Sequence, residues 1–265
     1  TTGDNNVAIG YGAGGVLTTG VDITVVGSRA GDALTTGSYN VAIGASALST
    51  EDTGRYNTAI GTFALEVLNS DTTDAYNTAV GYKAGVAMTI GVNNTILGGL
   101  AGDAINTGSQ NVAVGKASLS SATTASDNVG LGHGALSALT TSARNVAIGT
   151  QALNGAMATN SNTYNVAVGY YAGQAVTTGL HNTLIGGLAG DSLTGGSYNV
   201  AIGKGALSTE DGHGYNVAIG LNALNTQNAN ADAYNVAIGA NAGVSVTAGI
   251  YNTLVGGLAG DALTI

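Results

Sequence analysis

The segment SYNVAIGASALST, residues 38–50, contains the pattern from which the fold of this chain is predicted. Its central glycine, preceded by a branched aliphatic residue, recurs in register and defines 15 units along the 265 residues. Successive anchor glycines are 17 residues apart, except for two spacings of 20 and one of 19, and the added residues always precede the next Asn. Insertions confined to one corner of a repeat are typical of a solenoid. The anchor glycines are Gly10, Gly27, Gly44, Gly61, Gly81, Gly98, Gly115, Gly132, Gly149, Gly169, Gly186, Gly203, Gly220, Gly239 and Gly256.

The residues before each anchor glycine alternate as in a β-strand. Val or Thr stands three positions before the glycine, a branched aliphatic residue one position before it, and usually Ala between them. Such alternation favours a strand, and several glycines per unit disfavour a helix. A second short segment begins three residues after the glycine, where every unit has Ala except the one with Ser118. Two strands and their turns per unit predict an all-β fold, a parallel β-solenoid of about 15 coils of 17 residues forming one domain over residues 1–265.

Asn forms the most regular column of the repeat. It stands four residues before the anchor glycine in every unit but one, where Ile23 replaces it. Asn side chains stacked on successive coils can hydrogen-bond along the stack, and Asn tolerates the turn geometry at the start of a strand. We therefore predict a structural Asn ladder. Its members are Asn6, Asn40, Asn57, Asn77, Asn94, Asn111, Asn128, Asn145, Asn165, Asn182, Asn199, Asn216, Asn235 and Asn252.

Tyr often precedes the Asn of the ladder and forms a second column. Two interpretations are open: a half-exposed stacking ladder that stiffens the edge, which we favour, and a strip that binds a sugar or another surface ligand. The column consists of Tyr39, Tyr56, Tyr76, Tyr164, Tyr198, Tyr215, Tyr234 and Tyr251.

The segment GGLAGD has the glycine and aspartate content of a ligand-binding loop. It lacks the Lys and Ser/Thr that follow the glycines of a phosphate loop. It departs from the calcium-binding nonapeptide repeat, since an alanine replaces one glycine and no copy has a like neighbour to complete the oxygen ligands. We predict turn-stabilising aspartates, with calcium binding as the alternative. The three copies span residues 98–103, 186–191 and 256–261, and the aspartates are Asp103, Asp191 and Asp261.

In register, GGLAGD is one form of the coil. The fourth residue after the anchor glycine is either Leu or Gly, and every Gly-type coil has an apolar residue three positions later. The core volume therefore moves along the coil, as close packing requires. Where the residue two before the anchor is large, as at Ile96, Leu184 and Leu254, the residue after the anchor is also Gly. We predict that this double glycine makes room for the larger side chain.

The composition excludes several classes of function. The chain has 15 acidic and 6 basic residues, so no basic stripe can follow a nucleic-acid backbone. No run of about 18 apolar residues is present, so membrane insertion is not expected. There is no cysteine for disulfides or thiolate chemistry, and no motif predicts a cofactor.

No constellation of side chains predicts catalysis. His133, His181 and His213 stand in different columns, far apart in the chain, so their spacing supports no zinc site. Acidic residues such as Glu51 and Glu210 fall in turns of variable sequence, and the repeat has no break where a cleft would lie. We expect a protein that is not an enzyme and that, calcium apart, binds no metal.

Pairs of threonines recur eight and nine residues after the anchor, as in Thr18–Thr19 and Thr177–Thr178. Thr ladders at coil spacing bind ice in regular solenoids. Here the column is interrupted at Asp52, Asp211 and Gly195, so a flat surface would be patchy. Ice binding is therefore kept as an alternative function.

The phrase YNVAIG…AL, in residues 38–50 and 214–226, resembles the head repeats of YadA-type trimeric autotransporter adhesins. Similar repeats appear in phage and cyanophage tail-fibre proteins, and the resemblance covers essentially the whole chain. The units of the adhesin head are shorter, and its conserved serine is mostly Ala here. The resemblance implies a left-handed parallel β-roll, a homotrimer and a receptor-binding or spacer role outside the cell.

These observations predict a structural segment of an extracellular or virion fibre. If the fibre is adhesin-like, the segment would also bind a cell-surface glycan or protein receptor. A thin coil leaves a second apolar face, for which a homotrimer would supply partners. The chain begins and ends partway through a unit, without polar caps, which predicts either a piece of a longer fibre or a filament subunit that stacks end to end.

Overall fold

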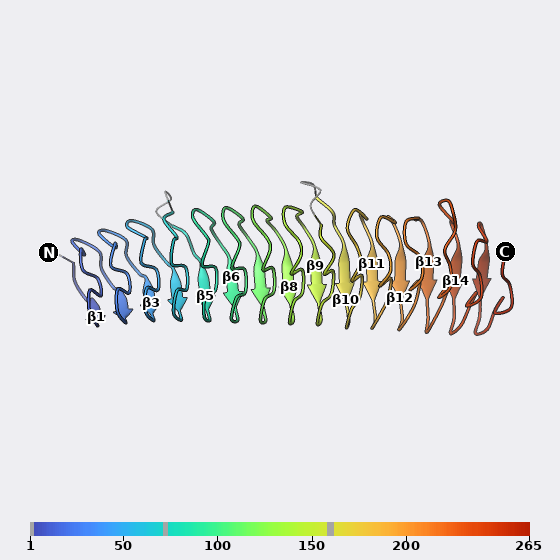
Figure 1. The fold of residues 1–265 in the computed structure, drawn as a ribbon, viewed down its shortest axis with the longest axis horizontal. Helices are drawn as coiled ribbons and strands as arrows, with labels where there is room; N and C mark the ends of the chain where they lie inside the picture. Colours follow the sequence, from blue (N-terminus) through green and yellow to red (C-terminus); the bar gives the residue numbers. More distant parts are fainter. Residues whose placement is uncertain (1–2, 71–73, 158–161) are drawn as a thin grey trace. The chain divides into compact units, whose positions relative to one another are not determined.

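The computed structural model describes residues 3–70, 74–157 and 162–265, and these ranges contain strands and turns but no helix that could span a membrane. Each strand has three residues and ends immediately before an anchor glycine. Figure 1 shows the strands of the described ranges joined by loops, without helices. The strands are β1 (Val7–Ile9), β2 (Thr24–Val26), β3 (Val41–Ile43), β4 (Thr58–Ile60), β5 (Thr78–Val80), β6 (Thr95–Leu97), β7 (Val112–Val114), β8 (Val129–Leu131), β9 (Val146–Ile148), β10 (Val166–Val168), β11 (Thr183–Ile185), β12 (Val200–Ile202), β13 (Val217–Ile219), β14 (Val236–Ile238) and β15 (Thr253–Val255).

The strands follow one another in sequence order in a 15-stranded sheet. Neighbouring strands are parallel and in register, so that Val166 lies opposite Thr183 and Ala167 opposite Leu184. The prediction of an all-β, parallel β-solenoid is confirmed. The chain divides into two compact units, Thr1–Gly130 and Leu131–Ile265, and the coils repeat the same arrangement within each unit.

The strands direct their middle residue, usually Ala, into the solenoid. Ala113 and Ala201 are fully buried, whereas Ile43, Leu97 and Ile185 remain 36%, 47% and 38% exposed. Successive residues of a strand point to opposite sides. The first and third residues of each strand therefore form two columns of β-branched and aliphatic side chains on the outside. We call these two columns the outer sheet face, and none of the 15 strands contributes a charged residue to it.

The predicted second strand after the anchor glycine is not formed, so that part of the prediction is wrong. In every coil the second and fourth residues after the anchor have positive φ, as at Ser46 (52°) and Leu48 (51°). Left-handed residues at alternate positions prevent an extended chain. The segment still bonds between coils, since the Leu48 N–H donates to the Ala64 carbonyl at 3.0 Å. Leu48 is fully buried, and its burial offsets the roughly 1–2 kcal/mol cost of the left-handed backbone.

The anchor glycines are required by both backbone conformation and contact between coils. Their φ angles lie between 121° and 143°, a region that glycine alone adopts readily. A Cβ on Gly186 would lie 2.6 Å from the carbonyl carbon of Gly203, the next anchor, and 2.7 Å from its oxygen. A side chain at an anchor position would therefore force neighbouring coils apart.

The large strand residue that precedes GGLAGD occupies space left by a different glycine from the one predicted. A Cβ on Gly187 would approach nothing nearer than the Tyr170 carbonyl oxygen, at 3.9 Å, so the prediction that the double glycine makes room is wrong. The space lies four residues after the anchor. A Cβ on Gly190 would be 2.8 Å from Leu184 Cδ2, and one on Gly173 in the preceding coil 2.7 Å from Leu184 Cδ1. Leu184 thus fills the core volume that a Leu takes in the other coil type.

The two adjacent glycines of residues 186–187 provide a matched test of this account. We expect Gly186→Ala to lower the free energy of unfolding by about 3 kcal/mol or more, because both φ and the Gly203 backbone oppose a Cβ. Gly187→Ala should change it by less than about 0.5 kcal/mol, since the Cβ meets open space. Urea unfolding followed by circular dichroism measures both. Equal losses in the two variants would contradict this assignment.

Candidate functional site

The Asn side chains form a buried column along the coils. From Asn40 to Asn235 every member of the column is fully buried. In both compact units, Thr1–Gly130 and Leu131–Ile265, the Oδ1 of one Asn accepts the backbone N–H of the Asn in the next coil at 2.8–3.3 Å. Most Nδ2 groups donate to the carbonyl 14 residues on, as Asn182 does to Gly196 at 2.8 Å. The column therefore satisfies backbone groups at the buried corner where each strand begins.

Among the described residues, two buried members of the column have an Nδ2 without a hydrogen-bond partner. These are Asn57 and Asn216, and each precedes a coil with added residues. Two others, Asn128 and Asn145, donate to the carbonyl two residues before them, at 3.0 and 3.2 Å. The ladder therefore varies in how its Nδ2 groups are satisfied.

The difference between paired and unpaired asparagines predicts different costs of removal. Asn182→Ala takes away the acceptor for the Asn199 N–H and the donor for the Gly196 carbonyl, both buried, and should lower the free energy of unfolding by roughly 2–4 kcal/mol. Asn216→Ala removes one acceptor and an unpaired donor, so its loss should be about half as large. Chemical denaturation of both variants provides the measurement. A larger loss in Asn216→Ala would disprove the ranking.

The Tyr column forms two stacked series of rings. In unit Leu131–Ile265 it includes His181, and neighbouring ring centroids are 4.8–5.5 Å apart with planes 9–15° from parallel. In unit Thr1–Gly130, Tyr39, Tyr56 and Tyr76 stack at 5.1 and 4.8 Å. The rings cover one another's faces and present edges and hydroxyls to solvent. This favours the stiffening ladder, because a sugar stacks on an exposed ring face; ligand binding by the column stays a prediction.

The three GGLAGD aspartates lie in separate places. Asp103 and Asp191 are half-buried, each with one carboxylate oxygen that has no hydrogen-bond partner, and Asp261 is exposed. Burial raises the pKa of Asp103 and of Asp191. No other acidic or histidine side chain among the described residues joins any of the three in a group of metal-ligand geometry. A single carboxylate falls short of the six or more oxygens that Ca²⁺ prefers, so calcium binding here has no geometric support beyond the sequence.

The raised pKa values of Asp103 and Asp191 predict a dependence of stability on pH. A carboxyl whose pKa is higher in the folded than in the unfolded state favours folding when protonated, and this contribution is lost as pH rises through the folded pKa. The double variant Asp103→Asn, Asp191→Asn should therefore gain stability over the wild type at pH 7 but not at pH 3. Thermal unfolding at both pH values tests this. A gain that is the same at both pH values would exclude the pKa explanation.

The Thr column bonds neighbouring coils. The Thr18 hydroxyl donates to the Thr35 carbonyl at 2.9 Å, and the Thr177 hydroxyl to the Thr194 carbonyl at 3.3 Å. The Thr194 hydroxyl donates to the Asp211 carbonyl at 2.7 Å, which continues the series where the sequence interrupts it. These hydroxyl protons are engaged within the solenoid. Ice binding by this column stays a prediction.

Two acidic residues of the turns between strands are buried inside the solenoid, which the sequence analysis did not predict. Glu51 and Glu210 are fully buried, at the position seven residues after the anchor where other coils place Leu34 or Met88. His213 lies beside Glu210, with Nδ1 3.4 Å from Oε1. In the sequence analysis the histidines were compared only with one another, and this pair was therefore not predicted. Glu210 stands at the same position of the repeat as the core residue Leu34, and this register could have predicted its burial.

The described residues enclose no pocket. No protein-family model matches the chain, and no curated protein or solved structure matches it either.

Proposed function

We propose that this protein is a non-enzymatic structural segment of an extracellular or virion fibre, in which identical chains associate side by side through the outer sheet face. The observation that carries the proposal is the orientation of the strands. The small Ala points inward, and the larger Val, Ile and Leu side chains point outward. A chain acting alone in water would gain more from the opposite arrangement, since burial of aliphatic side chains is favourable.

The outer sheet face has the properties of an association surface. Its third-position column is entirely aliphatic, its first-position column consists of Val and Thr, neither carries a charge, and both repeat at about 4.8 Å from coil to coil. Exposed contiguous apolar patches of this kind mark sites of protein association. Charged residues lie in turns and corners instead, as Lys116 and Lys204 do immediately after anchor glycines.

A second copy of the chain is the partner that matches this surface. Two copies present side-chain columns of identical spacing, so their ridges and grooves can interdigitate along the whole contact, as in paired sheets of identical strands. The homotrimer implied by the likeness to adhesin heads and tail fibres is the arrangement we favour. A solenoid with few charged residues suits a spacer or attachment segment of such a fibre.

The mass of the protein in dilute solution tests the association. Light scattering after size exclusion should give three times the chain mass of 25.6 kDa. The double variant Ile185→Lys, Ile238→Lys places two charges on the outer sheet face and should shift the protein to monomers at micromolar concentration, because a lysine cannot be buried unpaired.

Ala231→Lys serves as the matched control, since Ala231 is exposed in an enlarged turn outside the strands. It adds the same kind of charge and should leave the mass unchanged. A stable wild-type monomer, or dissociation by the control variant to the same extent, would overturn the proposal.

A further inference from the structure

Two turns of the solenoid share a four-residue sequence but surround its glutamate with different residues. The sequence Ser-Thr-Glu-Asp occurs at residues 49–52 and again at 208–211, at the same position of the coil. The glutamate of each copy, Glu51 or Glu210, is fully buried, and the aspartate that follows lies nearer the surface. The hydrogen-bond partners of the Glu51 carboxylate can therefore be compared with those of the Glu210 carboxylate.

Both oxygens of Glu51 are satisfied by the protein. Oε1 accepts the Gly54 N–H at 2.7 Å. Oε2 accepts the Ser70 N–H at 3.0 Å and the Ser70 hydroxyl at 2.8 Å. This copy is a structural carboxylate that closes the turn, and it has no need of a further ligand.

The neighbours of Glu210 have changed at both places. His213 stands where the first copy has Gly54, and Ala229 stands where it has Ser70, so the hydroxyl donor is lost. Oε1 still accepts a backbone N–H, that of His213 at 3.1 Å, but Oε2 has no hydrogen-bond partner although it is buried. The buried Nδ1 of His213 also lacks a hydrogen bond and lies 3.4 Å from Oε1.

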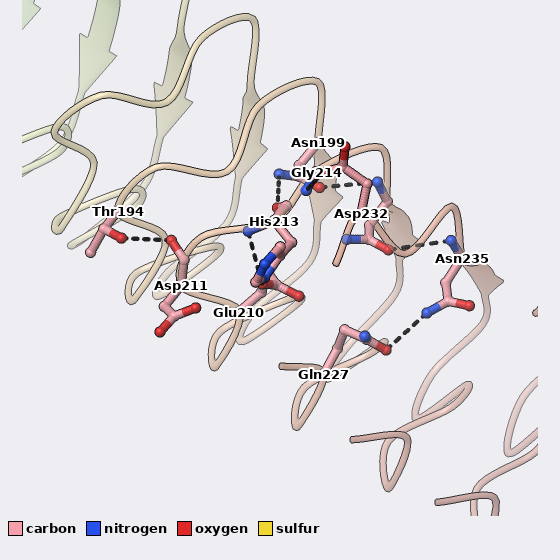
Figure 2. Close-up of polar contacts among 10 residues, drawn as sticks. Thr194, Asn199, Glu210, Asp211, His213, Gly214, Gln227, Asp232 and Asn235 are labelled. Atoms are coloured by element: carbon pink, nitrogen blue, oxygen red, sulfur yellow. Dashed lines mark hydrogen bonds and ion pairs between the residues drawn. The ribbon is translucent and has the colours of Figure 1, made fainter. Parts of the chain in front are cut away.

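The side chains of Glu210, Asp211 and His213 come together in the turn between β12 and β13 (Figure 2). One potential ligand atom from each lies within 4.8 Å of the other two. Among the described residues this is the only group of three or more acidic, histidine or cysteine side chains with such geometry. It combines a buried carboxylate oxygen and a buried imidazole nitrogen, each without a hydrogen-bond partner, with a carboxylate that reaches solvent.

We propose that Glu210, Asp211 and His213 bind one divalent transition-metal ion of the zinc type. Zn²⁺ takes mixed imidazole and carboxylate ligands in a four-coordinate site, and three protein ligands leave one position for water. Ca²⁺ and Mg²⁺ prefer sets made of oxygen alone, so the imidazole selects against them. The ion would join three residues of one turn and supply the positive charge that the buried Glu210 oxygen lacks.

This proposal is independent of the proposed fibre function, since the three ligands belong to one chain and lie outside the strands. It also revises the expectation that no zinc site exists, which rested on the distances between histidines. A bound ion would fix the turn and raise the stability of unit Leu131–Ile265, because a ligand that binds only the folded state stabilises it.

Calorimetric titration of the full chain, treated with a chelator and freed of any purification tag, tests the site. With ZnCl₂ we expect one ion per chain and a rise in the melting temperature, and with CaCl₂ neither. His213→Gly, which restores the residue of the first copy, should weaken zinc binding at least tenfold, and so should Asp211→Asn. Absence of zinc binding by the wild type would overturn the proposal.

Two control variants separate this site from adventitious binding. His133→Ala removes an exposed histidine in another coil, and Asp52→Asn removes the aspartate of the first copy. Both should bind zinc as the wild type does. If His213→Gly disturbs folding, the exposed Asp211 still gives a test, because Asp211→Asn leaves the buried carboxylate in place. Unchanged affinity in Asp211→Asn and His213→Gly, or equal loss in a control, would place the ion elsewhere and reject the assignment.

Discussion

The close approach of each coil to the next is the constraint on which the rest of the structure depends. Parallel coils must lie about one strand spacing apart around their whole circumference, including the turns. The anchor glycines permit this where the chain leaves the strand, since the next anchor's backbone occupies the place of a Cβ. The Asn column permits it where the chain enters the strand, since each side chain bonds to the next coil. Residues are added to a coil only between these two points, in the turn that precedes the Asn.

Narrowness of the coil explains the composition of its interior. The middle of the strand is usually Ala, and the larger core residues stand mostly at the fourth or the seventh position after the anchor. Leu184 shows that the volume is shared between neighbouring coils, because it fills space beside Gly173 and Gly190. The interior also admits polar side chains wherever hydrogen bonds satisfy them, as for Asn182 and Glu51. The branched aliphatic residues at the first and third positions of the strands lie outside instead, and the proposed association of chains rests on this arrangement.

Much of the fold follows from side-chain alternation and spacing, and the errors have local causes. The strand before each glycine could be predicted because Val, Ala and Ile alternate in the period of a strand. The second strand could not be excluded by composition, since Leu48 has low intrinsic preference for the left-handed backbone that it adopts. The role of Gly187 was misjudged because neighbours in sequence were compared, whereas the contact of Leu184 is with Gly173 in the preceding coil. The group at Glu210 was not predicted because the histidines were compared only with one another, although its three residues lie within four positions of the chain.

The sequence by itself determined the period of the coil, the place of the strand within it and the parallel stacking, because these depend on a pattern repeated 15 times in one chain. Which face of the strand points inward was decided only by the tertiary structure. A strand with Val and Ile on one side and Ala on the other can bury either side, and closure of a coil this narrow selects the smaller one. The partners of buried polar groups were likewise decided in three dimensions. Glu51 and Glu210 share the same local sequence, and they differ because the turn and the next coil bring a glycine and a serine to one and a histidine and an alanine to the other.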